Sequence, residues 1–320
     1  RVAGLEQRRF SAEHWRAIAT PLLERQHGVS LETIGHSAQG RPLRLVRWGD
    51  GATTVLLWSQ MHGDESTASM ALADLFAFLG QHPTHPLVVQ LRQQLALHVL
   101  PILNPDGAAR FTRRNAQGID INRDAAALAS PEARALKQLR DRLQPAFGFN
   151  LHDQRPGYRA GDSERGTAIA LLAPPYSADN AVNPVRARAF GVAARIRVAL
   201  EPHIKGHIAR WDNTYNPRAF GDLMQQWGTS TVLIEAGGIE GDSEKQQLRQ
   251  LTFLSLLAGL EAIASGSHED ISPALYTDLP ENGAVWPDLL LRGATVHSPD
   301  RAPVQTDVRI DFTDAMAYRD

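Results

Sequence analysis

The chain has 320 residues, a net charge of −2, 43% hydrophobic and 21% charged residues, which is an ordinary composition for a globular enzyme. Because positive and negative charges are nearly balanced, no bulk electrostatic attraction to nucleic acid or to a membrane surface is expected. The sequence contains no run of about 18 apolar residues, so no transmembrane helix is predicted. The chain contains no cysteine, so disulfides and thiolate ligands are excluded and a bound metal would need His, Asp or Glu.

The first part of the chain alternates strand-like and helix-like segments. Residues 43–48 and 53–59 are strand-like segments on either side of the sequence GDGA, and this pattern predicts a β-hairpin. In residues 65–80 apolar side chains recur at steps of three and four, which predicts an amphipathic helix that ends at Gly80. Residues 96–103 are expected to form a strand, and residues 104–124 a long polar loop.

The second part continues the alternation of strands and helices. Ser130 as N-cap and Pro131 as first helical residue predict a helix over residues 130–143. The remaining segments are predicted strands at 147–152, 167–174 and 230–238 and predicted helices at 184–202 and 242–264. This order predicts an α/β protein, a three-layer α/β/α sandwich on a mixed, mostly parallel sheet.

The composition changes after residue 265, where Pro, Asp, Gly and short apolar runs replace the long helical pattern. The runs at residues 285–296 and 304–312 predict a few edge or appendage strands. We therefore expect a main domain over residues 1–265 and a C-terminal extension with short strands, a small β appendage, over residues 266–320.

Polar residues of kinds used in catalysis follow the predicted strands at their carboxyl ends. His62 follows the predicted strand 53–59, His152 ends the predicted strand 147–152, and Glu235 lies near the end of the predicted strand 230–238. The polar loop 104–124 follows the predicted strand 96–103. Open α/β sheets bind ligands at this edge. Two histidines and a carboxylate with an open fourth position form a hydrolytic zinc site, which also needs a separate carboxylate to carry a proton.

Each of these residues also has an ordinary structural explanation. Asp64 would cap the helix that follows it, and Glu65 would interact favourably with the helix dipole. His152 alone is compatible with a plain strand-end histidine. Glu235 closes an apolar strand, where a carboxylate must be solvated or partnered.

His203 and His207 have the i, i+4 spacing of a metal pair on a helix. Pro202 and Gly206 predict that no helix continues through this segment, so we set the pair aside. Residues 35–43 predict a turn between strands.

Taken in order, these residues resemble the zinc carboxypeptidases of the carboxypeptidase A type. The family pattern of His-x-x-Glu, Asp-x-Asn-Arg, His and Glu is matched by HGDE at 62–65, DINR at 120–123, NLHD at 150–153 and LIEAGG at 233–238. NPDG at 104–107 and the Gly-x-Ser-x-x-Gly-Arg turn at 35–41 also match. The likeness spans about residues 30–265, and it implies a carboxypeptidase-like fold with one Zn²⁺ per chain.

The resemblance implies a role for each matching residue at the metal. His62, Glu65 and His152 are similar to the family's zinc ligands, and Asp120 to the carboxylate that orients a ligand histidine. Glu235 is similar to the general base and acid.

The resemblance also implies residues that bind substrate. Asn122 and Arg123 are similar to the residues that bind the C-terminal carboxylate, although Arg123 could instead form a surface ion pair with Asp120 or Asp124. Arg113 resembles the residue that polarises the scissile carbonyl, and spacing alone does not exclude Arg114. In WDNTYN, Tyr215 is similar to the mobile substrate tyrosine, but the following NPRAFGD departs from the animal digestive enzymes.

The activity implied is that of a zinc metallocarboxypeptidase, a metalloprotease that hydrolyses the C-terminal peptide bond, with residues 1–265 as its catalytic domain. Its partner is expected to be a peptide with a free C-terminal carboxylate, and neither nucleic acid nor a membrane. An N-acyl amino acid deacylase of the aspartoacylase and succinylglutamate desuccinylase type shares Asp-x-Asn-Arg and is the alternative. A non-catalytic zinc-binding relative would have lost a ligand or the glutamate, and neither is missing. The protein is expected to be soluble, because no transmembrane helix is predicted. Both a cytoplasmic and an exported location stay open, since a signal peptide that has been removed would not be seen in this sequence.

Overall fold

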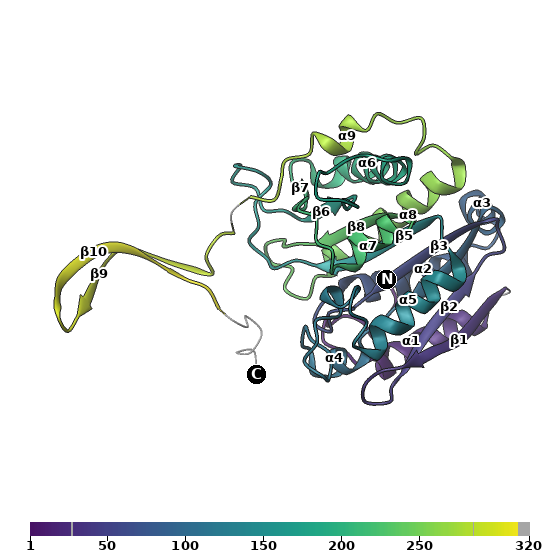
Figure 1. The fold of residues 1–320 in the computed structure, drawn as a ribbon, viewed down its shortest axis with the longest axis horizontal. Helices are drawn as coiled ribbons and strands as arrows, with labels where there is room; N and C mark the ends of the chain where they lie inside the picture. Colours follow the sequence, from purple (N-terminus) through teal and green to yellow (C-terminus); the bar gives the residue numbers. More distant parts are fainter. Residues whose placement is uncertain (27, 284, 313–320) are drawn as a thin grey trace.

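The computed structural model describes residues 1–26, 28–283 and 285–312, and its centre is an eight-stranded sheet (Figure 1). In spatial order the strands are β1 (Val29–His36), β2 (Pro42–Trp48), β4 (Leu95–Leu100), β3 (Thr53–Ser59), β5 (Phe147–Asp153), β8 (Ser230–Ala236), β6 (Ile169–Leu172) and β7 (Ile208–Arg210). The pairs β4–β3, β3–β5, β5–β8 and β6–β7 are parallel, and the other three are antiparallel. The sheet is therefore mixed and mostly parallel, as predicted.

Helices cover both faces of this sheet. One face carries α1 (Ala12–Glu24), α2 (Thr67–Gln81), α3 (Pro86–Gln94), α6 (Pro184–Ile204) and α8 (Gln246–Ser265), and the other carries α5 (Pro131–Leu143) and α7 (Phe220–Gln226). Alternate residues of β3 divide between the two cores, Val55 and Leu57 on the first side and Leu56 and Trp58 on the second. Burial on both sides explains the unbroken apolar run of β3 and confirms the three-layer sandwich.

The hairpin predicted from residues 43–48 and 53–59 is wrong. Strand β4 lies between β2 and β3 and pairs with both of them. The GDGA loop instead passes against the start of β4, where the Gly51 amide donates to Leu95 O at 3.1 Å. A Cβ at Gly51 would lie 1.9 Å from the carbonyl carbon of Gln94, so this glycine permits a close backbone crossing. The hairpin that does form is β1–β2, across the turn predicted at residues 35–43.

Helix ends follow their local signals only in part. Helix α5 begins as predicted, and Ser130 Oγ accepts from the Ala133 amide at 3.2 Å. Helix α2 ends at Gln81 rather than at Gly80, and Gly80 instead makes room for Gln26, to which a Cβ would approach within 2.5 Å. The alternative explanation of Asp64 as a helix cap does not hold, because the N-cap position of α2 is Ser66.

Two further boundaries differ from the prediction. Helix α6 continues through Pro202 to Ile204, so this proline lies in the last turn and does not break the helix. Helix α8 starts at Gln246, after Lys245 in a left-handed conformation with φ of 53°. The Asp242 carboxylate accepts hydrogen bonds from the first three amides of α8. It therefore caps the helix although it lies three residues before the N-cap position, Lys245.

The region predicted as a polar loop holds the short helix α4 (Pro105–Arg110) and a 3₁₀ turn (Ile121–Arg123). The elements α1, β1, α3, β7 and α7 were not predicted. In the predicted extension, α9 (Ala274–Thr277) places Tyr276 in the main core, where its Oη accepts from the Ala173 amide at 2.9 Å. In the described part of the chain, every helix is too short or too polar to cross a lipid bilayer.

The last two strands, β9 (Leu289–Ser298) and β10 (Arg301–Ile310), form a separate antiparallel sheet. We call this pair the ribbon. Figure 1 shows the ribbon, in yellow, extending away from the body of the molecule. The strands expected after residue 265 are thus present as an appendage rather than as edges of the main sheet.

Candidate metal centre and catalytic cavity

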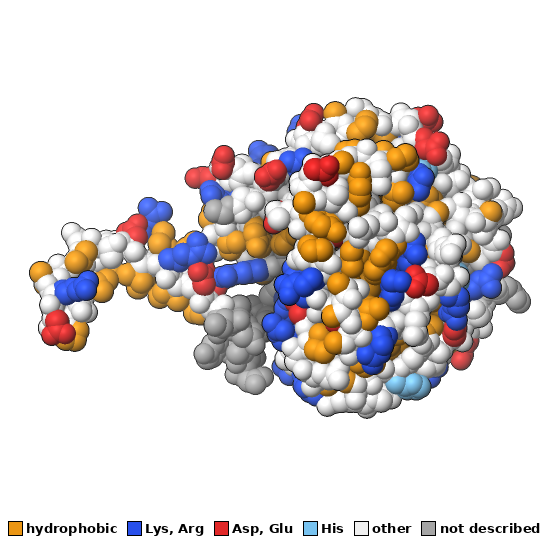
Figure 2. Space-filling model, in the orientation of Figure 1, with side chains coloured by type: hydrophobic (Ala, Val, Ile, Leu, Met, Phe, Trp, Pro, Cys, Tyr) orange, Lys and Arg blue, Asp and Glu red, His pale blue; other side chains and the backbone are white. Residues whose placement is uncertain are grey.

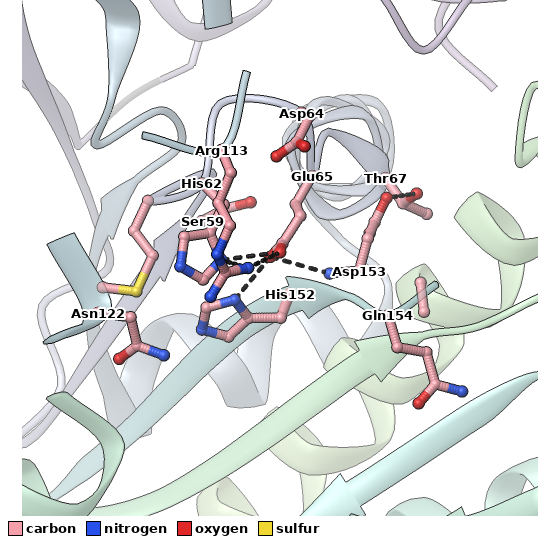
Figure 3. A network of polar contacts seen from close by, with 12 residues as sticks. Ser59, His62, Asp64, Glu65, Thr67, Arg113, Asn122, His152, Asp153 and Gln154 are labelled. Atoms are coloured by element: carbon pink, nitrogen blue, oxygen red, sulfur yellow. Dashed lines mark hydrogen bonds and ion pairs between the residues drawn. The ribbon is translucent and has the colours of Figure 1, made fainter. Parts of the chain in front are cut away.

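The carboxyl ends of β3 and β5 bring two histidines to one glutamate. His62 lies just after β3, His152 lies in β5, and Glu65 precedes α2. One carboxylate oxygen of Glu65 lies 2.7 Å from His62 Nδ1 and the other lies 2.7 Å from His152 Nδ1. Figure 3 shows these contacts meeting at the Glu65 carboxylate. The two strands are parallel neighbours, so their carboxyl ends necessarily present these side chains at one edge.

This cluster fits a metal ion. The three donor atoms lie within 4.8 Å of one another. All three residues are buried, with exposed fractions of 2% for His62, 8% for Glu65 and 3% for His152. Two imidazole nitrogens and one carboxylate match the donor set that zinc uses in hydrolytic sites. Although burial acts to raise it, the pKa of Glu65 is held well below its usual range by the charges of His62 and His152. Burial lowers the pKa of His152, which favours the neutral form that a metal requires.

Asp120 contacts the nitrogen of His62 that faces away from Glu65. Its Oδ1 lies 3.0 Å from His62 Nε2 and also accepts from the Asn122 amide at 3.0 Å. Burial opposes ionisation here, but the hydrogen bond from His62 and the charges of His62 and Arg113 hold the pKa of Asp120 below its usual range. An ionised Asp120 accepts a hydrogen bond from the Nε2–H group of a neutral His62, and this tautomer leaves the Nδ1 lone pair directed at the cluster.

Glu235 lies beside the cluster on the next strand. The pairing of β5 with β8 places it opposite His152, and its residue is 7% exposed. Among the described residues its Oε2 has no hydrogen-bond partner. Burial raises the pKa of Glu235 well above its usual range, and the charges of Glu65 and Asp153 raise it further. A buried carboxyl group of raised pKa is suited to accepting and releasing a proton near neutral pH.

A cavity of about 430 Å³ joins these groups. The predicted residues that line it are His62, Glu65, Arg113, Asn122, Arg123, His152, Tyr215 and Glu235, and Asp120 lies directly behind His62. His203 and His207 lie elsewhere, lining a different cavity, and His207 Nδ1 contacts Gly166 O at 2.7 Å.

The structure distinguishes Arg113 from Arg114. Nη1 of Arg113 lies 3.1 Å from Glu65 Oε1, and Nη2 lies 3.0 Å from Asp120 Oδ2. Arg114 is exposed and donates to Gly118 O at 2.9 Å. Arg113 is therefore the arginine that reaches the cluster, a distinction that depends on the loop conformation and could not be read from spacing.

Asn122 and Arg123 lie in the 3₁₀ turn that follows Asp120. Asn122 is 8% exposed, and its Oδ1 accepts from the Phe220 amide at 3.1 Å, so its NH₂ group remains able to donate to a ligand. Arg123 is exposed and donates to Asn122 O at 3.0 Å. Within the described residues Arg123 forms no ion pair, and Asp124 instead accepts from the Ser130 amide and hydroxyl at 2.7 Å. The surface ion pair considered for Arg123 is thus not formed.

Two further features of the cavity wall come from the segment between β7 and α8. Tyr215 is half-buried in the wall, in the loop before α7. Asp222, which we did not predict, lies in the first turn of α7 and is 6% exposed. Burial raises the pKa of Asp222 to about 6, although the Asn216 amide donates to it at 2.8 Å. The sequence carries no periodic signal for this short helix, so nothing indicated that it places a carboxylate in the cavity.

Comparison with known proteins agrees with this geometry. Residues 22–152 match the model of the zinc carboxypeptidase family. Among curated proteins, the chain is 29% identical over 129 residues to an uncharacterized protein of Zymomonas mobilis, covering 39% of this chain and 34% of that protein. It is 31% identical over 101 residues to Carboxypeptidase SOL1 of Arabidopsis thaliana, covering 29% of this chain and 21% of that protein. The aligned region thus spans about a third or less of the length of these relatives.

Solved structures share the fold. A metallo-carboxypeptidase from Burkholderia cenocepacia matches with a TM-score of 0.62 at 18% identity, covering 82% of this chain and 70% of that one. Carboxypeptidase A from Helicoverpa armigera matches with a TM-score of 0.64 at 16% identity, covering 80% and 74%. At these identities the likeness establishes the fold alone. Together with the family model, it confirms the resemblance seen in the motifs: residues 22–152 match the zinc carboxypeptidase family, and the chain has the fold of solved carboxypeptidases.

Proposed function

We propose that the chain is a zinc-dependent metallocarboxypeptidase that hydrolyses the C-terminal peptide bond of a peptide. The observation that carries the proposal is one cavity lined by a buried His-Glu-His donor set, a buried carboxyl group of raised pKa, and arginines that include Arg113 and Arg123. The family match supports the same activity. Bound zinc would supply a Lewis acid that polarises the scissile carbonyl and lowers the pKa of water.

His62, Glu65 and His152 would hold the metal. Asp120 would fix the tautomer and the ring orientation of His62 through the 3.0 Å contact with Nε2. Burial of the set excludes competing water and strengthens each electrostatic contact.

Glu235 would act as general base and then as general acid. Its unpartnered Oε2 would accept the proton of the attacking water and return it to the leaving amine. The raised pKa supports this role. A carboxyl group whose pKa lies closer to neutral pH can take up a proton as a base and then release it as an acid.

Arginines would supply the charge needed to bind and orient the substrate. Arg123 would pair with the C-terminal carboxylate, helped by the NH₂ group of Asn122. Arg113, which already lies at the cluster edge, would stabilise the negative charge that develops on the carbonyl oxygen. Tyr215 would close over the substrate from the loop before α7.

A direct experiment separates this proposal from a deacylase. Zinc-loaded protein is incubated with an unblocked peptide and, separately, with N-acetyl amino acids, each with and without a chelator. Chelator-sensitive release of the C-terminal residue from the peptide is the expected result. Hydrolysis of the N-acetyl amino acids without peptide cleavage would overturn the proposal.

A further inference from the structure

We propose that the catalytic cavity selects peptides that end in arginine or lysine, and that the Asp222 carboxylate binds the cationic side chain of this last residue. The inference rests on the proposed carboxypeptidase activity, because it assigns the side-chain pocket of the same site. Asp222 lines the cavity, yet it has no part in holding the metal, in proton transfer or in binding the C-terminal carboxylate.

The strand register places two leucines next to the metal and the base. His152 pairs with Glu235 across β5 and β8, and Leu233 lies two residues before Glu235 on the same face of β8. Leu233 pairs with Leu172 of β6, and both leucines line the cavity. A substrate whose scissile bond lies at the metal can therefore extend its last side chain along this apolar wall.

Asp222 faces the same space from the first turn of α7, and it is buried. Its hydrogen-bond donors are backbone amides, of which Asn216 N lies 2.8 Å away, and no described cationic side chain forms an ion pair with it. A buried carboxylate without a cation is unfavourable, and burial accordingly raises the pKa of Asp222 to about 6. A cationic ligand would stabilise the ionised form.

The two arginines whose charges act on Asp222 are engaged elsewhere. Arg186 is buried, and its guanidinium donates to three backbone carbonyls and to Asn213 Oδ1. Arg123 donates to Asn122 O, and in the proposed mechanism it binds the C-terminal carboxylate. The Asp222 carboxylate therefore remains available to a cation that the substrate brings.

Arginine and lysine match this pocket in both shape and charge. Each has an aliphatic stem, which would pack on Leu233 and Leu172, and a cationic head, which would pair with Asp222. An acidic side chain would be repelled, and an apolar one would leave the carboxylate unpaired. The choice is local to the cavity, because the net charge is only −2 and Figure 2 shows acidic and basic side chains interspersed on the face it draws.

Two peptides that differ only in their last residue, arginine or citrulline, test the pocket, because citrulline keeps the shape of arginine and lacks its charge. With zinc-loaded wild type we expect kcat/KM to be about ten- to a hundredfold larger for the arginine peptide, as for a hydrogen bond to a charged group. Asp222→Asn should lose most of this preference. Asp212→Asn, which changes an exposed carboxylate of the same cavity wall, is the matched control and should keep it.

Cleavage of both peptides with equal kcat/KM by the wild type would overturn the pocket and leave the carboxypeptidase activity standing. An unchanged preference in Asp222→Asn would also overturn the assignment, since another group would then read the charge.

A binding measurement separates a failure of the pocket from a failure of the proposed activity. Calorimetric titration of zinc-loaded Glu235→Gln with the same two peptides measures the preference with turnover suppressed. We expect the arginine peptide to bind about tenfold or more tightly, and the double variant Glu235→Gln/Asp222→Asn to lose this difference. That result would support the pocket even if the wild type cleaved neither peptide, and equal binding of the two peptides would overturn it.

Discussion

Lys245 joins the two strand ends that carry His152 and Glu235, and its removal gives a quantitative test of how the site is held. The residue is 2% exposed, and its Nζ lies 3.3 Å from Asp153 Oδ2 and donates to Ala236 O at 3.1 Å. Asp153 follows His152 in β5, and Ala236 follows Glu235 in β8. The lysine thus links the ends of two neighbouring strands from the start of α8.

Lys245→Met retains most of the volume and removes the charge. The substitution leaves the Asp153 carboxylate buried without its nearest cation, and breaking a buried ion pair in this way costs about 3–5 kcal/mol. Thr67 still donates to Asp153 at 2.6 Å, and Arg8 lies 4.0 Å away. Because these contacts remain, we expect a loss near the lower end, about 3 kcal/mol in the free energy of unfolding.

Urea unfolding followed by circular dichroism measures this loss. The control is Lys137→Met, which removes the more exposed pair with Asp141 and should cost about 0–1 kcal/mol. The double variant Lys245→Met/Asp153→Asn should recover part of the stability, since no unpaired buried charge remains. If Lys245→Met costs no more than the control, the buried pair does not hold the strand ends and the reasoning is refuted.

Three further predictions concern the metal, the base and a buried acid. His152→Ala should lose most of its bound zinc in metal analysis, and an unchanged zinc content would remove it from the ligand set. Glu235→Gln should keep its zinc while kcat falls about 10²–10⁴-fold, and near wild-type turnover would show that the carboxylate is structural. The pKa of Asp222, about 6, lies above the usual value of 3.8, so its stabilising effect is present below about pH 4 and is lost as pH rises through 6. Asp222→Asn should therefore gain up to about 3 kcal/mol over the wild type at pH 7 and little at pH 4, and a difference independent of pH would contradict this.

The sequence was most informative where local chemistry and strand direction act together. His62 and His152 could be placed at one edge because parallel strands end at the same side, and Glu65 follows His62 by three residues. The ordered motifs then supplied Asp120, which lies 3.0 Å from His62.

The errors arose where pairing over long distances decides the outcome. Gly51 signals a tight backbone path, but a local turn signal cannot show that β4, some forty residues later, inserts between β2 and β3. Asp222 reaches the cavity because α7 packs against β8, and a seven-residue helix is too short for a periodic pattern. Similarly, the ribbon strands could be predicted from β propensity, whereas the exposure of their side chains among the described residues is a property of the tertiary structure.

The central claim is that this cavity removes residues from free peptide C-termini with the help of Arg123. The most direct measurement compares kcat/KM for a peptide and its C-terminally amidated twin, using zinc-loaded wild type and Arg123→Ala. Hydrogen bonds to a charged group contribute about 1.5–3 kcal/mol, so the wild type should prefer the free acid by roughly ten- to a hundredfold and the variant should lose most of that preference. Equal cleavage of both peptides by the wild type would contradict the carboxypeptidase account.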